Sequence, residues 1–153
     1  MNRAIELARH GVEKGDGGPF GCVIVRGDDI VGEGWNRVVA ATDPTAHGEI
    51  NAIRAAASTL RSFSLAGCEI FTTGEPCPMC LAAIHWARIE RVVFAFTHAD
   101  AAAIGFADSA IMEQLRMPRD GRLVPEVAAP PALREQALAV ARAWFARPDR
   151  VHY

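Results

Sequence analysis

The stretches PTAHGEINAIR, residues 44–54, and TTGEPCPMCLAAIHWAR, residues 72–88, decide the fold of this chain. In the first, threonine and aspartate residues that favour helix N-caps precede an apparent helix that begins near His47. In the second, the strand-like run CEIFTT leads into PMCLAAIHWA, a helix opened by proline, which is a favoured early helical residue. Each stretch therefore brings chemically reactive side chains to the start of a helix.

The remaining residues also alternate between helix and strand patterns. MNRAIELARHGVEKG predicts an amphipathic helix that ends at GDGGP, and FGCVIV and IVGEGWN predict a hairpin turned at RGDD. VVAATDPTA is predicted to be a loop. RVVFAF predicts a fourth strand, and RLVPEV predicts a last strand that Pro125 places at an edge. IMEQLRM predicts a short helix, and apolar residues at helical spacing predict a terminal amphipathic helix (Leu133, Ala137, Val140 and Trp144).

This alternation predicts the α/β class, with helices packed on a sheet of about five strands. At 153 residues the chain is long enough to bury a core, so residues 1–153 are predicted to form a single domain. No internal repeat, low-complexity segment or linker interrupts the pattern.

Composition argues against two classes of partner. The net charge is −2 and the arginines are interleaved with acids, whereas a protein that grips a phosphate backbone usually shows a basic patch. No apolar run approaches the roughly 20 residues that a membrane span needs. Charges interrupt the N-terminal segment throughout, which is unlike a signal peptide. We therefore expect no nucleic-acid partner, no membrane span and a cytoplasmic location.

The four cysteines divide into two pairs of different character. Cys22 and Cys68 lie in apolar strand-like runs and are interpreted as small core residues. Cys77 and Cys80 are three residues apart at a helix start, where they share one face and their thiol pKa values are lowered. A single C-x-x-C pair is compatible with a redox pair or with half of a structural zinc site. The sequence holds no second C-x-x-C to complete a structural site.

His47 and Glu49 complete a candidate catalytic centre. With Cys77 and Cys80, His47 supplies a third zinc ligand and leaves the fourth position for water. Glu49 is suited to take a proton from that water and return it to a substrate. Alone, the H-x-E pair would indicate a solvated helix start. Residues two apart converge only in the irregular first turn, which is where the cap residues place them.

H-x-E followed by P-C-x-x-C is the signature of zinc nucleobase deaminases. The chain resembles the cytidine deaminase-like zinc hydrolase superfamily over nearly its whole length, which implies a three-layer α/β/α fold. Within it, GGPFGCVIV, GWNRVVAATDPTAHGE and DAAAIGFADS are similar to the bacterial guanine deaminase family. The resemblance implies one Zn2+ per chain on His47, Cys77 and Cys80. It also implies that zinc-bound water attacks purine C2, with Glu49 as proton shuttle, to give xanthine and ammonia.

The same resemblance implies a set of residues that contact the substrate. Asn36 would hydrogen-bond the purine, Phe20 and Trp86 would pack on its ring, and Asp108 would move protons near the amine. Each has a structural alternative. Asn36 ends a strand and could satisfy a turn, the aromatics could belong to the core, and Asp108 could cap the helix that follows it.

The C-terminal residues are the last feature with an implied role. By resemblance, residues 148–153 form a tail that covers the active site, with Tyr153 as an aromatic lid. In the family such tails are often exchanged between the subunits of a homodimer. The alternative is a frayed chain end.

Three positions depart from the family pattern. Gly48 replaces a usual alanine and lowers helix propensity by roughly 1 kcal/mol beside Glu49, Gly74 stands where a small hydroxyl residue or alanine is frequent, and Ala107 replaces a frequent acid. Alternative substrates are therefore guanosine, ammeline or cytosine, and the alternative enzyme is a tRNA adenosine deaminase. An alternative of another class is a zinc-stabilised binding protein without activity.

Overall fold

The computed structural model describes residues 1–106 and 108–152. The chain divides into two compact units, Met1–Met112 and Glu113–Tyr153, each of which is described by itself. The first unit contains the sheet and the predicted catalytic residues. Among the described residues, no helix is both long and apolar enough to cross a membrane.

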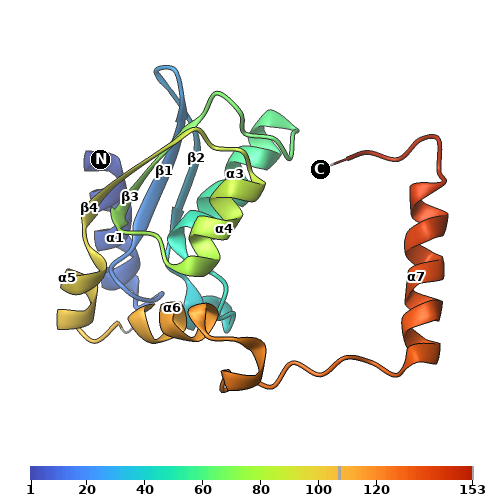
Figure 1. Ribbon diagram of the computed structural model, residues 1–153. Helices are drawn as coiled ribbons and strands as arrows, with labels where there is room; N and C mark the ends of the chain where they lie inside the picture. The colour runs from blue at the N-terminus through green and yellow to red at the C-terminus, as the bar shows by residue number, and fades with distance from the viewer. Residues whose placement is uncertain (107, 153) are drawn as a thin grey trace. The chain divides into compact units, whose positions relative to one another are not determined.

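The sheet of the first unit has four strands in the order β2-β1-β3-β4 within the described residues (Figure 1). The strands are β1 (Gly21–Arg26), β2 (Asp29–Trp35), β3 (Glu69–Gly74) and β4 (Arg91–Phe96). β1 is antiparallel to β2 and β3, whereas β3 and β4 are parallel. The β1–β2 hairpin is as predicted, and the α/β class is confirmed.

The predicted fifth strand is wrong. Residues 122–127, RLVPEV, adopt no regular structure, and Leu123, Val124 and Val127 are exposed. Pro125 lacks the backbone N–H that a strand would use for pairing. The proline within this segment therefore indicated its structure better than its apolar residues did.

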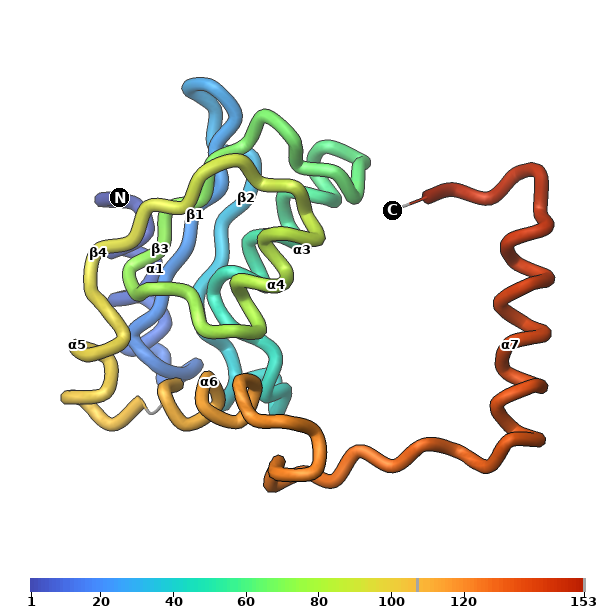
Figure 2. The backbone as a smooth tube through the Cα atoms, viewed as in Figure 1, coloured from blue at the N-terminus to red at the C-terminus, as the bar shows by residue number. Residues whose placement is uncertain are grey.

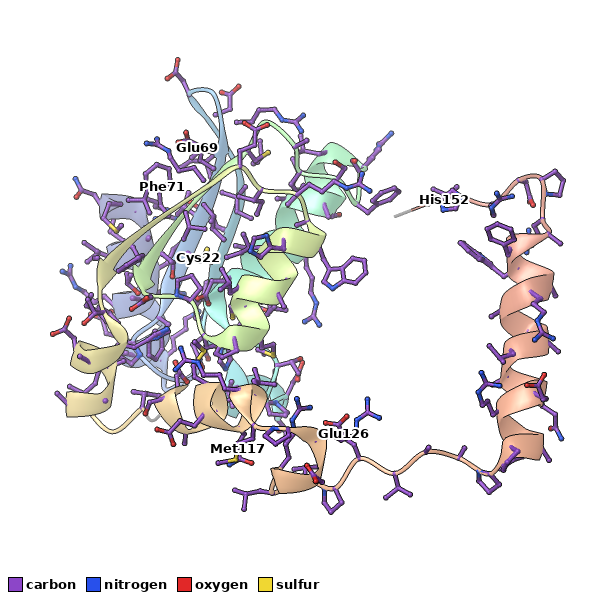
Figure 3. All side chains as sticks on the ribbon, in the orientation of Figure 1. Cys22, Glu69, Phe71, Met117, Glu126 and His152 are labelled. Atoms are coloured by element: carbon purple, nitrogen blue, oxygen red, sulfur yellow. The ribbon has the colours of Figure 1, made fainter. Side chains whose placement is uncertain are left out.

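Helices cover both faces of the sheet, as the three-layer fold requires (Figures 1 and 2). The side chain of Val23 packs with Ala4 of α1 (Asn2–Lys14) on one face. Its neighbour Cys22 points to the other face and joins the core under α3 (Gly48–Leu60) and α4 (Pro78–Trp86), as Figure 3 shows. Successive strand residues face opposite sides, so this single strand supplies both cores.

Two glycines of β2 allow α3 to lie directly on the sheet. A Cβ atom on Gly34 would stand 2.5 Å from the backbone nitrogen of Ala52 and would also collide with the carbonyl of Gly48. A Cβ atom on Gly32 would stand 2.7 Å from the backbone nitrogen of Ala56. The backbone of α3 thus rests against β2, which fixes the first turn of α3 at the end of the sheet.

The remaining helices are short or belong to the second unit. They are α2 (Val38–Ala41), α5 (His98–Ala103), α6 (Asp108–Arg116), the 3-10 helix η1 (Arg119–Gly121) and α7 (Pro131–Phe145). The segment that contains α2 was predicted to be a loop, and this prediction is wrong for four residues. The predicted terminal amphipathic helix is present as α7, which has no buried residue.

Candidate metal centre and active site

Three ligand-type side chains meet at the starts of α3 and α4. His47 is the N-cap residue of α3, Cys77 is the N-cap residue of α4, and Cys80 lies in the first turn of α4. The Nδ1 atom of His47 lies 3.6 Å from Sγ of Cys77 and 3.5 Å from Sγ of Cys80. The three potential ligand atoms all lie within 4.8 Å of one another.

The spacing and chemistry of this group fit one zinc ion per chain. Tetrahedral bonds of typical Zn–N and Zn–S length place nitrogen and sulfur about 3.5 Å apart, which agrees with both measured distances. An imidazole and two thiols select zinc over magnesium or calcium, which prefer oxygen. Three protein ligands leave one tetrahedral position open, as catalytic zinc sites do.

The thiol group of Cys77 is already predisposed to ionise. The hydrogen bond from Cys80, followed by that from His47, lowers the pKa of Cys77 to about 4. The interaction with Cys77 instead raises the pKa of Cys80, so the lowered pKa predicted for both thiols is wrong for Cys80. The Cys77 interaction also raises the pKa of His47. Metal ligands must be deprotonated, so a ready thiolate favours zinc binding.

Glu49 is a buried carboxyl group beside this ligand set. It lies in the first turn of α3, two residues after His47, and only 5% of it is exposed. Burial raises the pKa of Glu49 above its usual value. A carboxyl group whose pKa is raised toward neutrality can both accept and donate a proton. The first turn of α3 therefore holds the predicted proton carrier where it was expected.

A cavity of about 430 Å³ opens onto the ligand set and Glu49. Of the predicted substrate residues, Phe20, Asn36 and Asp108 line it. The chain also lines it with residues to which the sequence assigned no role, among them Phe106, Glu75, Val38, Val39, Pro44 and Ile111. This volume lies within the range of small-molecule pockets.

Two aromatic rings form one wall of the cavity. The ring of Phe106 meets that of Phe20 edge-on, with 4.8 Å between the ring centroids. Phe106 belongs to the stretch DAAAIGFADS, in which no spacing rule marks it as a cavity residue. Edge-to-face pairs are a favourable arrangement, and this one gives the cavity an apolar wall.

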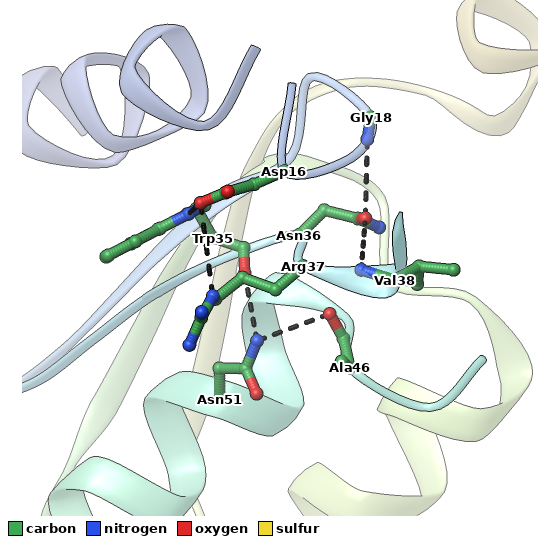
Figure 4. A network of polar contacts seen from close by, with 8 residues as sticks. All are labelled: Asp16, Gly18, Trp35, Asn36, Arg37, Val38, Ala46 and Asn51. Carbon is green, nitrogen blue, oxygen red and sulfur yellow. Dashed lines mark hydrogen bonds and ion pairs between the residues drawn. The ribbon is translucent and has the colours of Figure 1, made fainter. Parts of the chain in front are cut away.

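The side chain of Asn36 can both satisfy a turn and bind a substrate, because these roles use different atoms, its oxygen and its nitrogen (Figure 4). Its Oδ1 accepts hydrogen bonds from the backbone N–H groups of Gly18 at 3.3 Å and Val38 at 3.2 Å. Only 5% of Asn36 is exposed, and no hydrogen bond of its Nδ2 atom is made within the described residues. The oxygen thus satisfies a turn, and the amide nitrogen is left as a donor for a molecule in the cavity.

The polar network around Asn36 ties together two loops and the start of α3 (Figure 4). The indole N–H of Trp35 donates to Asp16 at 2.7 Å. The side-chain amide of Asn51 donates to the carbonyls of Trp35 at 2.9 Å and Ala46 at 3.2 Å. These bonds hold the wall of the cavity in register with the helix that carries Glu49.

Asp108 stands at the first residue of α6 and faces the cavity. Burial, followed by the negative charge of Cys77, raises the pKa of Asp108. A position in the first turn also suits a helix N-terminus. The structure thus brings Asp108 to the candidate site without removing its structural alternative.

The remaining predicted substrate residues do not join this group. Trp86 is the last residue of α4, is 69% exposed and is absent from the cavity wall. The structure therefore gives no support to the ring contact predicted for Trp86 within this unit. Tyr153 and Ala107 lie outside the described residues.

Comparisons with known proteins agree with this geometry. The family model for the cytidine and deoxycytidylate deaminase zinc-binding region matches residues 1–96. The tRNA-specific adenosine deaminase of Haemophilus influenzae is 42% identical over 108 residues, which cover 69% of this chain and 61% of that protein.

The guanine deaminase of Bacillus subtilis is 48% identical over 125 residues, which cover 82% of this chain and 80% of that protein. An X-ray structure of guanine deaminase from Bacillus subtilis matches with a TM-score of 0.93 and 42% sequence identity, over 99% of this chain and 95% of that one. The chain therefore belongs to the cytidine and deoxycytidylate deaminase family of zinc-binding proteins, and within it to the group that contains the guanine deaminase of Bacillus subtilis.

Proposed function

We propose that this protein catalyses the zinc-dependent hydrolytic deamination of guanine to xanthine and ammonia. The observation that carries the proposal is the buried carboxyl group of Glu49 beside His47, Cys77 and Cys80, at a cavity of about 430 Å³. The 48% identity to a guanine deaminase supports guanine as the substrate. Overall, water replaces the amine at purine C2: a C–O bond forms and the C–NH2 bond breaks.

His47, Cys77 and Cys80 would hold the metal. When bound there, zinc supplies a Lewis acid that lowers the pKa of a water molecule to about 7. The part played by the protein is to present one imidazole and two thiolates with their spacing already set. The low pKa of Cys77 favours the thiolate form that this role needs.

Glu49 would carry the proton through the reaction. It would take a proton from the attacking water and deliver it to N3, the ring nitrogen bonded to C2 that carries no hydrogen. The remaining O–H proton would then pass through Glu49, assisted by Asp108, to the amine, which departs as ammonia. The burial of Glu49 excludes competing solvent and raises its pKa, which favours the uptake of a proton from water. Such positioned proton transfer is typically worth about 10²- to 10⁴-fold in rate.

The other cavity residues would orient the purine. The Nδ2 atom of Asn36 is a donor for a ring or carbonyl acceptor, and Phe20 packs on the ring with Phe106 beside it. Asp108 would supply or receive a proton at the amine, for which its raised pKa is suited. Flat apolar walls and few polar groups are what a planar heterocycle requires.

The assembly is also part of the proposal. Residues 1–153 would act as one functional domain in a homodimer, with residues 148–153 covering the active site of the same or the partner subunit. Support comes from α7, whose apolar side chains Leu133, Val140 and Phe145 are exposed and would be buried by a second copy. A cytoplasmic location stays a prediction. Light scattering would give the subunit number, and deletion of residues 149–153 should raise KM or slow turnover.

The decisive experiment measures ammonia release from guanine, guanosine, cytosine, adenosine and ammeline. Guanine should be the preferred substrate. Glu49→Gln should keep one zinc per chain and lose turnover by about 10²-fold or more. Glu69→Gln is the matched control, since Glu69 is a glutamate of β3 that accepts a hydrogen bond from Arg91 outside the cavity. Turnover retained in Glu49→Gln would remove Glu49 from the mechanism.

A tRNA adenosine deaminase is the second candidate, favoured by the 42% identity to the Haemophilus influenzae enzyme. The net charge of −2 opposes it, because tRNA binding is driven by cationic contacts with phosphates. Adenosine in a tRNA anticodon stem-loop therefore belongs in the substrate panel. Zinc binding without activity on any substrate would instead identify an inactive binding protein.

A further inference from the structure

Glu75 is a cavity residue to which the proposed function gives no role. Its backbone N–H donates to the carbonyl of Phe96 at 2.8 Å, which extends the β3–β4 pairing past Gly74. The following residue, Pro76, restricts the backbone of Glu75 to extended conformations. The sequence assigned this residue no role, yet it lines the cavity.

One oxygen of the Glu75 carboxylate is anchored and the other is not. Oε2 accepts a hydrogen bond from the backbone N–H of His98 at 2.9 Å. No donor among residues 1–106 and 108–152 is bonded to Oε1, and 37% of the side chain is exposed. A carboxylate with one fixed and one open oxygen is oriented to receive a donor from a molecule in the cavity.

The imidazole of His98, whose backbone holds Glu75, is incompletely hydrogen-bonded. Its Nδ1 atom is buried and has no partner within the described part of the chain. The nearest carboxylate oxygen, Oε2 of Glu75, lies 3.8 Å away, which is too far for a hydrogen bond. Buried polar atoms without partners are rare, and here the backbone N–H of His98, not its ring, is the group that holds Glu75.

The polar groups of the cavity differ in what they can recognise. Nδ2 of Asn36 only donates, so it cannot receive a ring N–H. The proposed function engages the carboxyl groups of Glu49 and Asp108 in proton transfer. Guanine presents an N–H group at N1, which is bonded to the reacting carbon C2. Of the two ring nitrogens bonded to C2, only N1 carries a hydrogen. Glu75 precedes the ligand Cys77 by two residues, at most about 7 Å of chain, so N1–H is the ring donor within its reach when C2 lies at the ligand set.

We propose that Glu75 determines specificity by accepting a hydrogen bond from N1–H of guanine through Oε1. The inference rests on the proposed function. An ionised carboxylate only accepts hydrogen bonds, and charge-assisted bonds are the stronger ones. A purine with an unprotonated N1 places a lone pair against Oε1 and is disfavoured. Sites built to bond a substrate N–H reject analogues that lack it much more strongly than apolar pockets reject size variants.

The test compares guanine with 2-aminopurine in the zinc-loaded protein and in Glu75→Gln. 2-Aminopurine keeps the amine at C2, but its N1 is an acceptor. In Glu75→Gln, kcat/KM for guanine should fall about 10- to 100-fold. The value for 2-aminopurine should stay constant or rise, because the glutamine amide can donate to N1. The other difference between the two purines, O6, affects both proteins alike, so the change in the ratio isolates Glu75.

Three further measurements test whether Glu75→Gln changes substrate recognition rather than zinc binding or folding. Zinc content should stay at one ion per chain, because Glu75 is close to Cys77. Calorimetric affinity for 8-azaguanine, which retains N1–H, should weaken in Glu75→Gln and change little in the control Glu69→Gln. Glu75→Asp keeps the carboxylate on a side chain one methylene shorter, so it should give an intermediate preference for guanine. This variant replaces Glu75→Gln in the test if Glu75→Gln does not fold.

The possible results separate this inference from the proposed function. If the unaltered protein releases no ammonia from guanine, the proposed function fails. If it is active on guanine and the guanine to 2-aminopurine ratio is the same in Glu75→Gln and Glu75→Asp, only the role of Glu75 fails. Equal losses on both substrates, accompanied by loss of zinc, would make Glu75 a structural residue and overturn the inference.

Discussion

The indole N–H of Trp35 donates to the carboxylate of Asp16 across 2.7 Å, and this bond joins the loop after α1 to the end of β2, beside the cavity residues Gly17 and Asn36. The backbone carbonyl of Asp16 also accepts hydrogen bonds from Val39 at 3.1 Å and Ala40 at 3.0 Å. Asp16 therefore holds both Trp35 and α2. Asn36 directly follows Trp35, so the same hydrogen bond also positions Asn36.

Loss of the hydrogen bond between Trp35 and Asp16 should weaken substrate binding more than it slows the chemical step. Trp35→Phe keeps an aromatic ring but removes the donor, so we expect KM for guanine to rise about 10-fold while kcat changes less than about 3-fold, as for the loss of one bond to a charged group. Asp16→Asn should act in the same direction. The double variant should be little worse than the worse single variant, because both remove one interaction. Additive losses would show that the two residues act independently.

Asp108→Asn should separate a catalytic role from a capping role. Burial raises the pKa of Asp108 in the folded state, so the ionised form is disfavoured by folding. Its contribution to stability is full below the unfolded pKa and is lost as pH rises through the folded pKa. At pH 7, Asp108→Asn should thus slightly stabilise the zinc-free protein, by less than about 1 kcal/mol because the group is partly exposed and screened.

The same Asp108→Asn variant should lose turnover on guanine by about 10²-fold if the carboxyl group moves protons at the amine. Urea unfolding of the zinc-free protein gives the stability, and ammonia release gives the turnover. A lower free energy of unfolding with unchanged turnover would assign Asp108 to the helix start instead.

Removal of zinc should destabilise the first unit, and the stabilisation by zinc should require the three ligands. Zinc at 1,000 times its dissociation constant stabilises a folded protein by about 4 kcal/mol, which is about 10 °C in melting temperature for a chain of this size. Thermal melts with chelator and with added zinc measure the difference. Cys80→Ser should abolish it. Cys68→Ala, at a fully buried cysteine outside the ligand set, should melt lower but keep the response to zinc.

The ligand group was predictable from sequence because helix starts are local features. The threonine and aspartate caps predicted before His47 are wrong, because His47 itself is the N-cap residue of α3 and no side chain caps this helix. The proline after Cys77 does open α4, and the C-x-x-C spacing places both cysteines at its start. The meeting of the two helix starts in space was implied by resemblance alone. The prediction for Trp86 had no such support: Ile84 of α4 faces the core, and a residue two positions further along a helix points to the other side.

Features that depend on contacts between distant residues were missed. The four-residue helix α2 lies in a segment without helical periodicity and begins where Asp16 accepts its free N–H groups. Phe106 follows a glycine with positive φ, in a turn that carries no repeating pattern. Its contact with Phe20 and its place in the cavity wall are visible only in the folded structure.

Glu33→Gln should reveal a pH-dependent contribution to stability. Arg3 donates to Glu33 at 2.6 Å and 2.9 Å, and these hydrogen bonds lower the pKa of Glu33. The contribution is present above the unfolded pKa and is lost as pH falls through the folded pKa. The variant should be less stable by about 0.5–1 kcal/mol at pH 7, with no difference at about pH 2. Glu13→Gln, at an exposed glutamate of α1, is the control in urea unfolding.

Gly34→Ala should disturb both the fold and the position of Glu49. The new methyl group would meet the backbone of α3 at Ala52 and at the carbonyl of Gly48, and neither is a flexible side chain that can move aside. Overpacking of this kind costs about 1–3 kcal/mol, and the shift it forces falls on the residue before Glu49. We therefore expect a lower melting temperature and reduced turnover together. Gly121→Ala, where an added methyl group meets nothing closer than 3.9 Å, should change stability by less than about 0.5 kcal/mol. An unchanged Gly34→Ala protein would mean that α3 does not rest on β2 through this glycine.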